Sequence, residues 1–110
     1  MAYDEDLANR IRELLADVPV TEKKMFGGLA FLVGGHMTVA ASGQGGLLVS
    51  CEREHTAELL EKPHAAPMVM RGKEMEGWVR VDGEGVRTKR QLEPWVRRGL
   101  ARARSLPPKG

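Results

Sequence analysis

Cys51 and the three histidines are the residues of this chain that could do nucleophilic or metal chemistry. Cys51 and His55 lie four residues apart, but no second closely spaced ligand pair completes a zinc site, so we expect neither a metal nor a cofactor. A nucleophilic cysteine needs neighbours that lower its pKa, whereas the flanking sequence LLVSCERE places acidic side chains beside this one. We therefore interpret Cys51 as a small core residue.

The paired acidic residues do not indicate acid–base catalysis either. Glu74/Glu76 and Asp82/Glu84 lie in polar stretches, where both carboxylates of a pair are solvated. No residue set meets the requirements of a catalytic site, and we expect that the protein is not an enzyme. The alternative, a small-ligand or enzymatic role, would need a pocket around Cys51, His64 and the nearby methionines.

Two glycine pairs, Gly27-Gly28 and Gly34-Gly35, bracket the apolar run in MFGGLAFLVGGHM. A phosphate-binding loop needs a glycine-rich turn that leads into a helix, and no helical pattern follows either pair. We expect a bulge or a close backbone approach at Gly27-Gly28 and a two-residue hairpin turn at Gly34-Gly35.

The C-terminal segment is strongly basic. Residues 87–110 carry eight Lys or Arg against Glu93 alone, whereas the rest of the chain carries nine basic and fourteen acidic side chains. A basic helical stripe could contact nucleic-acid phosphates, but a solvated helix face shows the same pattern and is the interpretation we favour. The candidate basic patch consists of Arg90, Arg97 and Arg104, spaced by seven, with Arg98 and Arg102 beside them.

The segment GWVRVD predicts a strand with two different faces. Val79 and Val81 share one face, and Trp78 and Arg80 share the other. If the valines face the core, Trp78 beside Arg80 resembles an interface anchor for a partner. The other interpretation is a tryptophan covered by the chain's own neighbouring turn or helix.

The run Leu29–Val33 is apolar at every position, and strands of this kind are normally covered on both faces. In a domain of two layers, the second cover could be a partner subunit. We therefore expect self-association, as a homodimer, through an uncovered sheet face.

Periodicity predicts three helices and five strands that position these residues. The first helix covers residues 4–17 with Asp4 as its N-cap, and the last begins with the capping-box pair Thr88 and Gln91, although Pro94 suggests a distorted first turn or a start nearer residue 93. Short connections favour antiparallel pairing, hence a two-layer α+β fold with a mostly antiparallel five-stranded sheet. The remaining elements are a short helix over 53–62 and strands over 24–33, 36–42, 47–52, 66–70 and 77–82.

Composition is that of an ordinary globular domain, with 42% hydrophobic and 29% charged residues. The 110 residues suit one domain that spans residues 1–110. No apolar run reaches the roughly 18 residues of a membrane span, and the acidic N-terminus lacks the features of a signal peptide. With one cysteine and no possible intrachain disulfide, we expect a cytoplasmic protein with no membrane contact.

Three stretches of the chain resemble the N-terminal domain of the TfoX/Sxy competence regulators. They are KMFGGLAFLVGGHM (24–37), KPHAAPMVMRGKEMEGWVRV (62–81) and WVRRGLARARSLPPK (95–109). The resemblance implies a two-layer α+β fold similar to that of secretion chaperones, with the order helix, three strands, helix, two strands, helix. It implies no catalytic residues.

The resemblance also implies a role. Full-length regulators of this family promote DNA-uptake genes together with a cyclic-AMP-dependent transcription activator, and they carry a second, helical domain that this sequence does not contain. We therefore expect a small non-enzymatic protein-interaction domain that is accessory to transcription regulation, with a protein partner such as the transcription machinery. Direct nucleic-acid binding is the alternative. The expected partner-binding residues are Trp78, Arg80, Arg90, Arg97, Arg98, Arg102 and Arg104.

Overall fold

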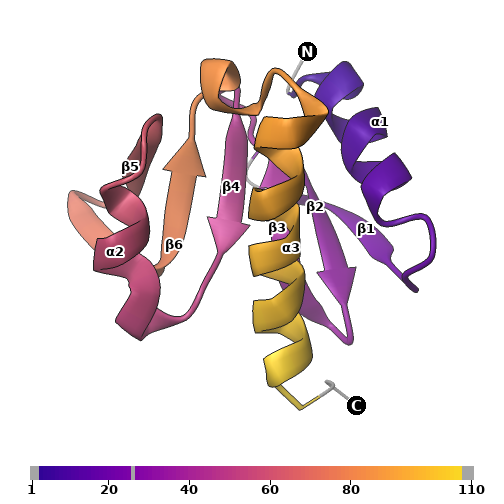
Figure 1. The fold of residues 1–110 in the computed structure, drawn as a ribbon. Coiled ribbons are helices and arrows are strands. Elements are labelled where there is room, and N and C mark those ends of the chain that lie inside the picture. Colours follow the sequence, from indigo (N-terminus) through magenta and orange to yellow (C-terminus); the bar gives the residue numbers. More distant parts are fainter. Residues whose placement is uncertain (1–2, 26, 108–110) are drawn as a thin grey trace.

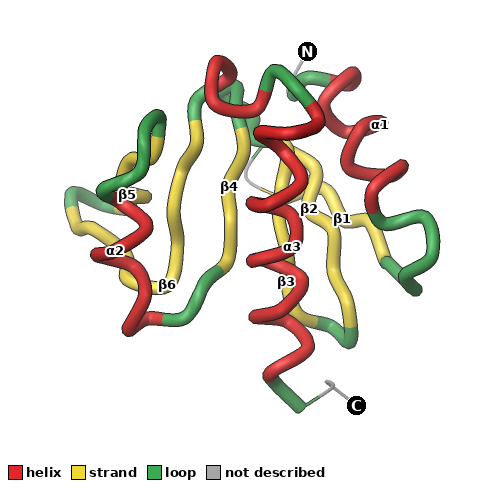
Figure 2. Tube along the Cα trace, in the orientation of Figure 1, coloured by secondary structure: helices red, strands yellow, loops and turns green. Residues whose placement is uncertain are grey.

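A computed structural model describes residues 3–25 and 27–107, which form three α-helices and one six-stranded antiparallel sheet (Figure 1). The sheet order is β1-β2-β3-β4-β6-β5. All three helices lie on the same face of the sheet (Figure 2). The helices are α1 (Glu5–Leu14), α2 (Thr56–Leu60) and α3 (Lys89–Ser105). The strands are β1 (Thr21–Met25), β2 (Gly28–Val33), β3 (His36–Ala41), β4 (Leu47–Ser50), β5 (Ala65–Met70) and β6 (Lys73–Val81).

The α+β class, the antiparallel pairing and the order of the helices are as predicted, but the strand number is wrong. The single strand expected over 24–33 is two strands, because β1 ends at Met25 and β2 begins at Gly28 and runs back along it. Residues 21–24 of β1 are all exposed. An edge strand without a buried face shows no apolar alternation, which is why periodicity did not reveal it.

Both glycine interpretations hold in the structure. Gly34 and Gly35 have φ values of 61° and 85°, the two positive angles of a type I′ hairpin turn between β2 and β3. A Cβ on Gly28 would collide with the backbone carbonyl of Ala41 on β3, so this position is a close backbone approach.

The β5–β6 hairpin is longer than expected. The predicted strands over 66–70 and 77–82 leave residues 71–76 outside any strand, but β6 already begins at Lys73 and pairs there with Met70. Arg71 and Gly72 form the turn, with φ values of 54° and 78°. The predicted helix over 53–62 is a 3₁₀ turn, Arg53–His55, followed by the short α2.

Helix α3 begins where the capping box places it. The Thr88 hydroxyl accepts a hydrogen bond from the Gln91 backbone N–H (3.2 Å), and the Gln91 side chain accepts one from the Thr88 N–H (3.1 Å). The alternative start near residue 93 is therefore wrong, and Pro94 lies inside the helix. Because Pro94 is close to the N-terminal end, its missing N–H removes only the bond to the Arg90 carbonyl.

The main core lies between the helices and the sheet. Phe31, Val39, Val49 and Val79 project from four adjacent strands toward the helices and are fully buried. The helices contribute apolar residues spaced by three or four positions, which is the spacing that places them on one helical face. They are Leu7 and Ile11 from α1, Leu59 from α2, and Leu92, Trp95 and Val96 from α3.

A second, smaller cluster lies on the other face of the sheet. Ala30, Ala40 and Leu48 are buried there, each on a strand whose neighbouring residues face the helices. No helix of the described residues covers this face (Figure 1). The two-sided apolar character of β2 is therefore real, and the second side is an open surface. In the part of the chain that the structure describes, no helix is long and apolar enough to cross a membrane.

Candidate functional site

The open face of the sheet is strongly curved. Met25 on β1 and Met68 on β5 line the same groove, although β1 and β5 are the two edges of the sheet. In a flat sheet, five strand spacings would separate these edges by about 24 Å. Bulges interrupt the register at Phe31/Leu32 and at Pro67/Met68, and bulges bend strands and increase their twist. Gly77 (φ 89°) adds a kink in β6.

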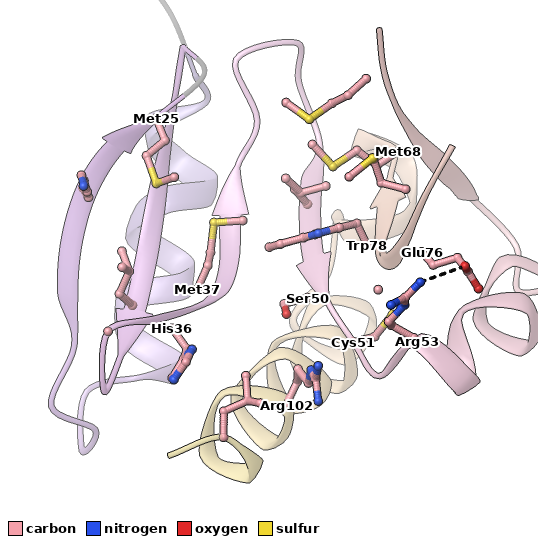
Figure 3. A pocket seen from close by; sticks show the side chains of 18 residues that line it. Met25, His36, Met37, Ser50, Cys51, Arg53, Met68, Glu76, Trp78 and Arg102 are labelled. Atoms are coloured by element: carbon pink, nitrogen blue, oxygen red, sulfur yellow. Dashed lines mark hydrogen bonds and ion pairs between the residues drawn. The ribbon is translucent and has the colours of Figure 1, made fainter. Parts of the chain in front are cut away.

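The concave surface is a groove that methionines line, which we call the methionine groove. It has a main compartment of about 690 Å³ and a smaller one of about 230 Å³. The two compartments share Met25, Met37, Leu48, Met68 and Met70 (Figure 3). Met75 lines the main compartment as well, so every methionine of the described residues lies in the groove.

Trp78 lies in the middle of this groove, between Met37 and Met68 (Figure 3). The predicted faces of its strand are confirmed, since Val79 and Val81 are buried in the main core and Trp78 is half-buried on the opposite side. Within the described residues, its indole N–H makes no hydrogen bond. The groove therefore contains an aromatic surface and one available hydrogen-bond donor.

Arg80 shares the face of Trp78, as expected, and lines the smaller compartment. Its guanidinium Nη2 donates a hydrogen bond to the Ser42 hydroxyl (3.0 Å), which holds the side chain against the β3–β4 turn.

The charged side chains that line the main compartment form what we call its mouth. They are Lys23, Arg53 and Arg102, together with Glu76, which accepts a hydrogen bond from Arg53 (3.3 Å) (Figure 3). His36 lies at the same mouth, and its Nε2 donates to the carbonyl of Pro107 (2.6 Å). This contact ties the segment after α3 to the start of β3.

Cys51 lies below the groove and is nearly inaccessible, with 4% of its surface exposed. Burial raises the pKa of its thiol, and the Thr56 hydroxyl lies 3.7 Å from the sulfur and partly opposes this shift. The thiol is therefore protonated at neutral pH, which confirms its interpretation as a core residue. Among the described residues, no three His, Cys, Asp or Glu side chains are grouped so that they could hold a metal ion.

The pocket that the small-ligand alternative required is present only in part. Cys51 and the methionines line one groove, but His64 lies outside it. Its Nδ1 instead faces the Asp82 carboxylate at 3.0 Å. The thioethers of the groove supply adaptable apolar contact, and His36 and Glu76 line the same groove.

The five predicted arginines of α3 differ in their surroundings. Arg98 stacks over the Trp95 ring, 4.7 Å from its centroid, and Arg102 reaches the mouth of the methionine groove. Arg97 is exposed and pairs with Glu93 (3.1 Å). Of the predicted arginines, Arg90 and Arg104 are also exposed, and they lie toward opposite ends of α3.

No individual methionine is among the predicted site residues, although the small-ligand alternative included the methionines near Cys51 and His64. A signal for them exists, because Met68 and Met70 are two positions apart along β5, and residues at that spacing share one face of a strand. Periodicity of two shows which residues share a face. It does not show that the two edges of the sheet curve toward one another.

Comparison with known proteins supports the resemblance on which the fold expectation rested. The model of the TfoX N-terminal domain family matches residues 13–103, which is most of the 110-residue chain. No curated protein matches the chain. The protein belongs to the TfoX N-terminal domain family.

Proposed function

We propose that this protein is a non-enzymatic protein-interaction domain and that the methionine groove is its binding surface. The observation that carries the proposal is the apolar sheet face that no described helix covers (Figure 1). A contiguous apolar surface of this kind is typical of an interaction site.

The composition of the groove supports a protein ligand. Methionine side chains are unbranched and polarisable, and surfaces built from them repack around different apolar partners. Trp78 adds a rigid aromatic side chain of the type that dominates binding energy at interfaces. Family membership supports an accessory role in transcription regulation, with a component of the transcription machinery as the partner.

A homodimer formed through the same face is the second form of this proposal. A chain that exposes an apolar groove can bury it against a copy of itself. Light scattering over a range of protein concentrations tests this form, and a monomeric mass at the highest concentration would exclude it.

Direct nucleic-acid binding is the other candidate function. The observation that favours it is the exposure of Arg90, Arg97 and Arg104 along the outer surface of α3. Binding through this stripe would weaken steeply with added salt, and the double charge reversal Arg97→Glu/Arg104→Glu would abolish it. Unchanged duplex binding by that variant would show that the stripe is a solvated surface.

The main proposal is tested by affinity capture from a host lysate with matched variants. Met37→Lys/Met68→Lys places two charges in the half-buried groove, and Ala57→Lys adds one on the exposed surface of α2. We expect wild type and Ala57→Lys to retain the same partner after nuclease treatment, and the groove variant to lose it. Capture that survives the groove variant, or that nuclease removes, would contradict the proposal.

A further inference from the structure

The charges around the methionine groove are unequally distributed. Lys23, Arg53 and Arg102 lie at the mouth of the main compartment, and Glu76 is the acidic side chain that lines it. Arg53 is already paired with Glu76 (3.3 Å), which leaves Lys23 and Arg102 without an acidic partner among the described residues. A ligand in this groove therefore meets an apolar floor and two cations without an acidic partner.

The backbone of the sheet limits what kind of peptide can lie in the groove. The groove is on a face of the sheet, and the N–H and C=O groups of the inner strands beneath it, β2, β3, β4 and β6, are already used between neighbouring strands. A bound extended segment would leave its own backbone groups without partners against an apolar floor, and this is costly. A helix satisfies its backbone internally and presents an apolar stripe, so a helix fits the groove and an extended strand does not.

The same charges disfavour a second copy of this chain as the occupant. A two-fold dimer through this face would place Lys23 and Arg102 of both copies in an interface whose lining carboxylate, Glu76, is already paired with Arg53. Charges without partners in an interface weaken association.

From these observations we propose that the methionine groove binds an amphipathic helix of a different protein, with acidic residues beside its apolar stripe that pair with Lys23 and Arg102. This inference rests on the proposed function and names the chemistry of the partner. The apolar stripe contacts the methionines and Trp78, and the acidic residues pair with the two cations.

The test uses three synthetic helical peptides of equal length. All carry the same leucine stripe, and they differ only in three positions beside that stripe, which are Glu, Gln or Lys. Fluorescence anisotropy of the labelled peptides against the full chain gives their affinities. We expect the Glu peptide to bind about tenfold more tightly than the Gln peptide at low salt, since it can form two exposed ion pairs, with Lys23 and with Arg102. The Lys peptide should bind most weakly.

Charge reversal at the mouth tests the assignment. Lys23→Glu/Arg102→Glu should reverse the order of the Glu and Lys peptides. Arg97→Glu, which changes the same charge on the outer surface of α3, should leave the order unchanged. Added salt should shrink the difference between the peptides, because the pairs are exposed.

The outcomes separate this inference from the proposed function. Suppose that all three peptides bind wild type equally and that Met37→Lys/Met68→Lys abolishes their binding. This result would overturn the inference of an acidic partner but would still support the groove as an interaction surface. Absence of binding by every peptide, or binding that the groove variant does not weaken, would count against both. If the double variant Lys23→Glu/Arg102→Glu still prefers the Glu peptide, the acidic residues of the ligand do not pair with Lys23 and Arg102, and that part of the inference is overturned.

Discussion

Gly99 of α3 lies directly against the backbone carbonyl of Thr38 on β3, with no room for a side chain between them. Thr38 is the residue that the β2–β3 bulge leaves out of register, and its hydroxyl donates to the Phe31 carbonyl (2.8 Å). The helix therefore packs tightly against the sheet at a point where the register of the sheet shifts. The residue that α3 contacts on the covered face, Thr38, is therefore also the bulged residue that helps to curve the open face.

Replacing Gly99 by Ala should destabilise the fold. In an exposed helix position the change would gain about 1 kcal/mol of helix propensity, but here the added methyl group meets backbone that cannot rotate away. We expect a net loss of roughly 1–3 kcal/mol in the free energy of unfolding by urea. Ala101→Gly, two residues along on the exposed side, serves as the control for propensity, and a stabilised Gly99→Ala protein would refute the packing argument.

Removing the N-cap of α3 should cost a predictable amount. Thr88→Ala leaves the Gln91 N–H without its side-chain acceptor, and we expect a loss of about 1 kcal/mol in unfolding free energy. Thr21→Ala on the exposed edge strand removes a threonine that makes no such contact and should stay within about 0.5 kcal/mol of wild type. Equal effects of the two changes would mean that the capping box does not stabilise the helix.

Stability should depend on pH through Arg12 of α1 and Glu22 of β1. Two hydrogen bonds of 2.7 Å join the guanidinium to the carboxylate and lower the pKa of Glu22. A lowered folded-state pKa gives stability that is present above the unfolded pKa of about 4.3 and is lost as the pH falls through the folded value. Because both side chains are substantially exposed, we expect only roughly 0.5 kcal/mol.

Urea unfolding of Glu22→Gln at pH 7 and pH 3 measures this contribution. The difference from wild type should be present at pH 7 and mostly absent at pH 3. Glu13→Gln on the exposed side of α1 is the matched control. A difference that persists unchanged at pH 3 would assign the effect to packing instead of charge.

Cys51 should resist alkylation in the native protein. Burial raises its thiol pKa, so little thiolate forms at pH 8, and the reagent also needs the site to open. We expect the rate with iodoacetamide to be at least about 100-fold lower than in urea-unfolded protein, as an opening free energy of roughly 3 kcal/mol requires. A native rate equal to the unfolded one would show that the thiol is accessible.

The sequence was most informative where local chemistry decides the structure. Four features follow from short-range patterns. They are the helix that contains Leu7 and Ile11, the capping box at Thr88, the turn at Gly34-Gly35 and the opposite faces of Val79 and Trp78. In each case, the observed element is the one that spacing and backbone preference predict.

The groove could not be predicted in the same way because it depends on curvature. Three features together bring Met25 and Met68 into one groove. They are the bulge at Thr38, the kink at Gly77 and the length of the β5–β6 hairpin. None of these three features has a distinctive sequence pattern. Seven-residue spacing likewise does not reveal that Arg98 stacks on Trp95 or that Arg102 lines the methionine groove.

Because all the described methionines lie in one groove, oxidation of methionine would change the surface of that whole groove. Oxidation converts a thioether to a polar sulfoxide, and the half-buried groove methionines are reachable while the main core contains none. Mild treatment with peroxide would therefore make the floor of the groove polar and leave the packing between the helices and the sheet intact. A methionine sulfoxide reductase would restore the apolar surface.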